Sequence, residues 1–326
     1  MLLGLGLMCF SMVLRAFAWH AILQAALPRA RVRLRDALQG TFIGVLMSAT
    51  LPARLGEPSR AFVVARRIGS ARLHLPVVLG TIVSQTLLNI VALIVLGVVM
   101  FSTVDLFTHH TALLVVAIAP LAIVASLLLL PALLRSGKTE RSEAGDADHT
   151  KQAAFGASFR RAAALVTQAR AALVQLRGGL TVFRRPRLGA AATAAQLSAW
   201  VVQWLSCYVL LVALGLDETA GLGAAAAVLF AVNVTAVLPA TPSNVGIFQA
   251  ACVAVLAAYG VGYADALAYG IILQDVEIAT AVVMGAPALV KEGLSWREVR
   301  LRAMHSSPVE LAPVGSFGRG EVSDLA

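Results

Sequence analysis

Long apolar runs without a charged residue recur along the chain. Residues 75–101 and residues 113–134 are two such runs, and each exceeds the length of about 20 residues that a helix needs to cross a bilayer. In lipid, a single segment can satisfy its own backbone hydrogen bonds only as a helix. A transmembrane β-barrel would require short alternating segments instead. The pattern therefore predicts an all-α polytopic membrane protein with about five to six full crossings.

Two further apolar runs are too short for a simple crossing, and both end in the same tripeptide. Leu-Pro-Ala at 51–53 follows residues 37–51, and Leu-Pro-Ala at 238–240 follows residues 223–238. Arginines on both sides of the first break place it at the cytoplasmic face, whereas residues 188–290 contain no Lys or Arg, which places the second break outside. Two short broken hairpins, re-entrant and of opposite sidedness, are typical of inverted repeats. The alternative interpretation is two ordinary helices that end at a proline.

These features divide the chain into four parts and predict a multi-pass protein of the cell (plasma) membrane with a cytoplasmic C-terminus. The basic helix in the second part has an apolar stripe, which favours either packing against protein or binding to the anionic inner leaflet. The parts are a first membrane half (1–134) with a break at 48–62, a cytoplasmic polar linker and basic amphipathic helix (135–187), a second membrane half (188–290) with a break at 235–248, and a cytoplasmic, disordered tail (291–326).

Composition supports the membrane assignment and narrows the partners. Of 326 residues, 59% are hydrophobic and 13% are charged, whereas a soluble domain has roughly 45–50% and about 25%. The net charge of +9 lies in loops beside the apolar runs, as the positive-inside rule requires, so we expect no nucleic-acid partner. The three cysteines are isolated and the six histidines form no metal-binding motif, so we expect neither a metal nor a cofactor.

The first break carries charged residues that suit a lipid headgroup. Arg54, Glu57, Ser59 and Arg60 follow the first Leu-Pro-Ala at short spacing. Two guanidiniums around one carboxylate leave a net positive site, and guanidinium binds phosphate through two parallel hydrogen bonds. These four residues are predicted to bind an anionic headgroup. The alternative is an anchor whose arginines extend to the headgroups at the cytoplasmic end.

A second set of polar residues is predicted to line a cavity or to couple protons. Carboxylates in the middle of the last crossing are costly in lipid, so we expect them to face the interior and pair with an arginine of the first break or bind protons. The two amides that lie four residues apart on one helix face could equally serve as contacts between helices. The set consists of Gln85, Asn89, Asn244, Gln249, Asp275 and Glu277.

Three stretches, in order, carry a resemblance to a known family. They are "RAFAWHAIL", "GTFIGVLMSATLPARLGEPSRAFVVARRIG" and "LPATPSNVGIFQAACVAVLAAYGV". Together they resemble the flippase-like membrane proteins related to the N-terminal membrane domain of lysylphosphatidylglycerol synthase, over about residues 15–291. The first break, with Arg54, Gly56, Glu57 and Arg60, is the most specific part. The second departs from the family pattern, because Ser243 and Asn244 stand where Pro-Gly is usual.

The resemblance implies movement of a phospholipid or polyprenyl-linked lipid between leaflets, or service to an enzyme that makes such a lipid. The sequence shows no set of acid, base and nucleophile, so we predict a protein without enzymatic activity. The alternative is a non-catalytic membrane partner of a lipid synthase or glycosyltransferase, docked through the basic helix. A lipid-phosphate phosphatase is a weaker alternative, because the Gly-rich loop and paired glutamates expected with one are absent.

Overall fold

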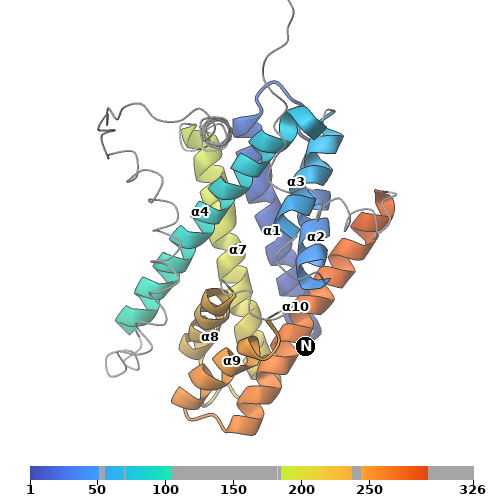
Figure 1. The fold of residues 1–326 in the computed structure, drawn as a ribbon. Coiled ribbons are helices and arrows are strands. Elements are labelled where there is room, and N and C mark those ends of the chain that lie inside the picture. The colour runs from blue at the N-terminus through green and yellow to red at the C-terminus, as the bar shows by residue number, and fades with distance from the viewer. Residues whose placement is uncertain (51–55, 70, 104–181, 183–184, 237–243, 293–326) are drawn as a thin grey trace, which may run out of the picture.

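A computed structural model describes residues 1–50, 56–69, 71–103, 182, 185–236 and 244–292, and in these ranges every regular element is an α-helix (Figure 1). The all-α prediction is therefore confirmed for the described part of the chain. In chain order the helices are α1 (Leu2–Ala26), α2 (Leu34–Thr50), α3 (Gly56–Arg67), α4 (Ala71–Thr103), α7 (Pro186–Ala213), α8 (Leu222–Thr235), α9 (Ile247–Ala258) and α10 (Tyr263–Lys291).

Four of the described helices are long and apolar enough to cross a membrane. They are α1, α4 over its segment His74–Val98, α7 and α10. Their length and composition make the chain a multi-pass membrane protein. The crossing predicted over 113–134, the basic helix predicted within 135–187 and the tail from 293 onward lie outside the described residues.

Helices α2 and α3 form an antiparallel pair, in which the start of α2 lies beside the end of α3. Asp36 in the first turn of α2 accepts a hydrogen bond from Arg67 at the end of α3, with 2.7 Å between Oδ1 and Nη1. At the other end of the pair, Gly56 begins α3 against Gly44 of α2, so closely that a Cβ on Gly56 would lie 2.1 Å from the Gly44 carbonyl oxygen. The absence of a side chain at Gly56 therefore sets how closely the two helices approach.

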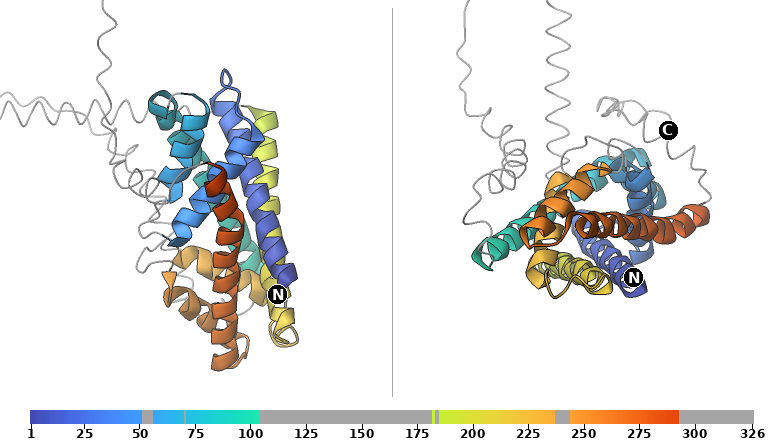
Figure 2. Two further views of the ribbon diagram at one scale, coloured as in Figure 1. Left: turned by 90° about the vertical axis from the view of Figure 1, so that its right-hand side faces the viewer. Right: turned by 90° about the horizontal axis from the view of Figure 1, so that it is seen from below.

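Helices α8 and α9 form a second short pair near the opposite end of the long helices (Figures 1 and 2). Ala226 and Ala227 in the first half of α8 pack against Tyr259, which follows the last residue of α9. The two helices therefore also run antiparallel. Two short pairs thus lie at opposite ends of the molecule, whereas re-entry into the membrane stays a prediction, because both Leu-Pro-Ala tripeptides lie outside the described residues.

Helix α10 packs against both short pairs. Gly285 meets α2, where a Cβ would lie 2.7 Å from the Phe42 carbonyl oxygen, and Gly270 meets Cys252 of α9. Glycine at these two positions lets α10 approach both neighbours closely. Helix α10 therefore connects the two pairs through direct contacts.

The apolar core of the described residues forms two large clusters. One gathers α1, α3 and the first half of α4 around the fully buried Trp19. The other gathers α7, α8, α9 and α10 around the fully buried Tyr269, whose hydroxyl donates to the Cys207 carbonyl at 2.9 Å. The chain thus has two packed regions, and polar side chains lie between them.

We expect Gly56→Ala to lower the thermal unfolding midpoint of the purified protein in detergent. The new Cβ would lie 2.0 Å from Ser48 Oγ and 2.1 Å from a backbone oxygen, so α2 and α3 must separate. Overpacking of this kind typically costs about 1–3 kcal/mol. Gly6→Ala is the control, because no atom of the described residues lies within 4 Å of a Cβ there. Equal midpoints for the two variants would contradict the close packing of α2 on α3.

Candidate functional site

Polar side chains form a layer across the interior, between the two apolar clusters. On α4, Gln85 and Asn89 lie between Val78, which belongs to the first cluster, and Leu93, which belongs to the second. Helix α4 also contributes Thr81, and α1, α3 and α7 contribute the other members. This polar layer consists of Arg15, Trp19, Glu57, Arg60, Thr81, Gln85, Asn89, Gln196, Trp200 and Gln203.

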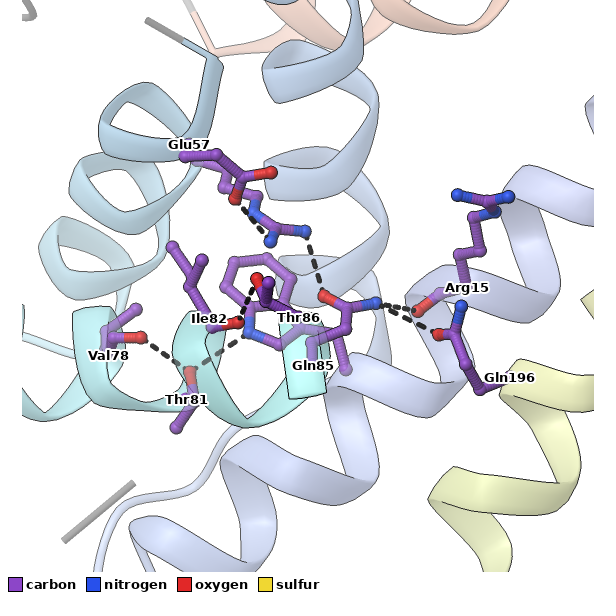
Figure 3. Close-up of polar contacts among 10 residues, drawn as sticks. Arg15, Glu57, Val78, Thr81, Ile82, Gln85, Thr86 and Gln196 are labelled. Carbon is purple, nitrogen blue, oxygen red and sulfur yellow. Dashed lines mark hydrogen bonds and ion pairs between the residues drawn. The ribbon is translucent and has the colours of Figure 1, made fainter. Parts of the chain in front are cut away.

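Arg60 is a cation held on several sides. It is 9% exposed and its guanidinium carbon lies 4.8 Å from the centre of the Trp19 ring. Its Nη1 donates to Gln85 Oε1 at 2.9 Å, and its Nη2 forms an ion pair with Glu57 (Figure 3). The Glu57 side chain is 50% exposed. The ring and the amide therefore fix the guanidinium, while its carboxylate partner remains accessible.

Arg15 repeats this arrangement on α1. Its guanidinium donates to Gln203 on α7 and lies 5.6 Å from the centre of the Trp200 ring. The Nε atoms of Arg15 and Arg60 are both buried, and neither finds a hydrogen-bond acceptor among the described residues. A guanidinium carries five N–H donors, so both cations retain capacity for a further acceptor.

The amides of α4 and α7 connect the two arginines. Gln85 Nε2 donates to the Arg15 carbonyl oxygen at 3.1 Å and to Gln196 Oε1 at 3.5 Å (Figure 3). Gln196 in turn donates to Asn89 Oδ1 at 2.6 Å, which also accepts from the Trp200 indole at 3.2 Å. Gln85 and Gln196 each donate and accept a hydrogen bond, and Asn89 accepts two. The network therefore fixes the relative positions of α1, α4 and α7.

The ring of Trp19 is held in place from α4. Its Nε1 donates to Thr81 Oγ1 at 3.0 Å, and Thr81 donates to the Val78 carbonyl oxygen of its own helix at 2.6 Å. A buried indole N–H needs such a partner. Because Thr81 fixes the ring, the aromatic face lies ready beneath the Arg60 guanidinium.

Carboxylates balance the two cations. Glu57 pairs with Arg60, and Glu277 on α10 interacts electrostatically with Arg15. Asp275, two positions away on α10, is exposed instead. Among the described residues, the cation in electrostatic reach of Glu277 is therefore Arg15 of α1, while Arg54 of the first break lies outside them. No group of three or more His, Cys, Asp or Glu in the described residues is placed to hold a metal ion.

The structure separates the predicted site residues into two places. Glu57, Arg60, Gln85 and Asn89 meet in the polar layer, and Ser59 is buried on α3 beside them. Arg54 lies outside the described residues.

Two further predicted residues, Asn244 and Gln249, lie at the second short pair. Gln249 bonds to Gln274 of α10 and accepts from the backbone N–H of Gly246 at 2.7 Å. Asn244 has a positive φ of 54°, a conformation that asparagine tolerates better than most residues. The contacts of these residues organise the start of α9 and do not reach Arg60.

Sequence reasoning missed several members of the layer, although signals were present. Arg15 is a cation near the middle of an apolar crossing, which alone marks a functional candidate. Gln196, Trp200 and Gln203 follow at spacings of four and three, so they share one face of α7. The contact between Trp19 and Arg60 has no sequence signal, because it depends on how α1 packs beside α3.

The family is established by comparison with known proteins. The family model described as lysylphosphatidylglycerol synthase TM region matches residues 1–285. The chain belongs to this family. The predicted resemblance is thereby confirmed, and the lysylphosphatidylglycerol synthase TM region is a membrane domain associated with lipid handling. No curated protein and no solved structure matches the chain significantly.

Gln85→Leu is expected to destabilise the protein more than a substitution at the next position of the same helix. The change removes the acceptor of Arg60 and the donor to the Arg15 carbonyl, and a buried polar group left without a partner costs about 1–3 kcal/mol. Thr86→Val is the control, since exposed Thr86 bonds, within the described part of the chain, only to Ile82 of its own helix. A thermal midpoint of Gln85→Leu equal to that of Thr86→Val would contradict a connecting role for Gln85.

Proposed function

We propose that this protein moves a lipid with an anionic, phosphate-bearing headgroup between the leaflets of the cell membrane, without covalent chemistry. Membership in a lipid-handling membrane family supports a lipid substrate. The observation that carries the proposal is the set of contacts around the Arg60 guanidinium. A buried guanidinium is fixed by Trp19 and Gln85, and its remaining ion-pair partner is a half-exposed carboxylate.

The Glu57 carboxylate occupies the position that a headgroup phosphate would take. Both are oxyanions, and guanidinium binds either with charge-assisted hydrogen bonds. A phosphate that displaces Glu57 would form an ion pair with Arg60, and this cation would not become exposed to lipid. The unpartnered Nε atoms of Arg60 and Arg15 offer further donors. The polar layer thus supplies a path for a headgroup, while the acyl chains stay in the bilayer.

The two short helix pairs supply the access to this path. In the proposal, α2–α3 enters from the cytoplasmic side and α8–α9 from the outer side, as inverted repeats, and both return to the side they came from. Helix α10 packs against α2 and α9, so it can transmit a movement of one pair to the other. Glu277 on α10 interacts electrostatically with Arg15. Its negative charge would balance the positive charge of Arg15 when no phosphate is bound.

Arg60→Gln is expected to slow lipid movement at least about tenfold, since a hydrogen-bonded charge contributes about 1.5–3 kcal/mol. The measurement uses phosphatidylcholine vesicles with purified protein and a fluorescent phosphatidylglycerol, whose outer-leaflet fraction is followed by chemical quenching. Arg66→Gln is the matched control, because Arg66 is an exposed arginine on the same helix. A folded Arg60→Gln protein that moves the probe at the wild-type rate would refute the site. No movement by folded wild type, for this probe or a polyprenyl phosphate, would refute translocation and favour the synthase-partner hypothesis.

Glu57→Gln tests the competition between carboxylate and phosphate. Removing the competing charge is expected to tighten binding of phosphatidylglycerol to the detergent-purified protein severalfold, because the headgroup no longer displaces an ion pair. Asp265→Asn, an exposed acid at the start of α10, provides the control for a general change in net charge. Weaker binding by Glu57→Gln than by Asp265→Asn would show that Glu57 positions the guanidinium and does not compete with the ligand.

A further inference from the structure

A groove lies between α2 and α10, apart from the polar layer. It encloses about 300 Å³, at the lower end of the range for ligand sites. The α2 side presents residues 35, 39 and 42, and the α10 side presents residues 284, 287 and 291, each set at the spacing of one helix face. The residues used below are Arg35, Gln39, Phe42, Met284, Pro287 and Lys291.

The groove lies beside a close contact of its two helices. A Cβ on Gly285 would lie 2.5 Å from Leu46 Cβ, so α10 touches α2 there. The adjoining face of α10 is apolar and exposed, with Val283 at 54% and Val290 at 79%. In a membrane protein such a face contacts lipid. The groove is therefore accessible to lipid from the side.

At the mouth of the groove, the basic side chains line the groove and the neighbouring acidic side chains do not. Arg35 precedes Asp36, and Lys291 precedes Glu292. Arg67 binds both acids, with 2.7 Å to Asp36 and 2.5 Å to Glu292. Adjacent helical residues point in different directions, so the acids turn toward Arg67 while both bases face the groove. Arg35 and Lys291 are exposed, and no ion pair with an acid occurs for either among the described residues.

A buried amide lies one turn inward from these bases. Gln39 is 6% exposed, and its buried Oε1 has no hydrogen-bond partner among the described residues. A buried polar atom without a partner is costly, which points to a ligand that supplies one. The two ends of an amide exchange by a half-turn of the side chain. Gln39 can therefore donate to an ester carbonyl or accept from a hydroxyl at this depth.

We propose that the groove binds a single anionic glycerophospholipid, separate from any lipid that passes the polar layer. Arg35 and Lys291 bind its phosphate, Gln39 bonds to its glycerol-ester region, and one acyl chain follows Phe42 and Met284. Basic pockets between membrane helices bind anionic headgroups in this manner. Lys291 lies beyond the residues that the family model matches, so the family assignment does not include the complete site. The site requires no translocation.

The test uses phosphatidylglycerol with a photoactivatable acyl chain and a clickable tag, in phosphatidylcholine vesicles that contain the full-length protein. We expect labelled peptides from α2 and α10. The double variant Arg35→Gln/Lys291→Gln is expected to reduce this labelling at least about tenfold. The matched control is Arg29→Gln/Arg31→Gln, which removes the same charge at the same end through exposed residues outside the groove. An equal loss of labelling in both double variants would mean that general attraction to the basic surface explains the labelling, and it would overturn the site.

Two single variants test the path of the acyl chain and the independence of the groove from the polar layer. Met284→Trp leaves the charges intact but fills the groove, and it is expected to abolish the α2 and α10 labelling. Unchanged labelling in that variant would overturn the placement of the acyl chain. Arg60→Gln is expected to label like wild type at the groove, whatever its effect on translocation. Failure of the groove and failure of the proposed function are therefore distinguishable.

Discussion

The need to accommodate two guanidiniums at membrane depth governs the rest of this structure. Arg60 and Arg15 cannot be left in hydrocarbon, so protein groups must take the place of water around them. Each receives a tryptophan face and a glutamine oxygen, and each has a carboxylate within electrostatic reach. These groups come from α1, α3, α4, α7 and α10. The convergence of these five helices around two cations is consistent with the need to solvate both charges.

The polar layer also divides the packing of the protein. Apolar cores are close-packed and resist gradual deformation, whereas hydrogen-bonding side chains can exchange partners when water or a headgroup supplies the alternative. The two apolar clusters are therefore the rigid parts, and the layer between them is the place where water or a headgroup could replace a protein partner.

The sequence predicted much of this arrangement, and the reasons for its failures are physical. Apolar run length predicted the helices, and the repeated Leu-Pro-Ala predicted two short pairs, because both are properties of consecutive residues. The Glu57–Arg60 pair followed from a spacing of three on one helix, although Arg54 was an equal candidate. Contacts such as Arg60 with Trp19 and Gln85 depend on the packing of separate helices, which spacing along the chain does not encode. Arg15 was missed because cations of the site were sought at the first break, although amides and carboxylates of intact crossings were included.

Charge counting reaches a similar limit at the end where α2, α3 and α10 meet. In the sequence, Arg35 beside Asp36 and Lys291 beside Glu292 cancel, and both pairs look neutral. In the fold, Arg67 pairs with both acids and draws them away from the groove, while the two bases face it. The local field at the groove is therefore more positive than its sequence neighbourhood indicates. Because that field comes from a contact between three helices, a substitution at Arg67 would free two acids and change the charge of a surface it does not line.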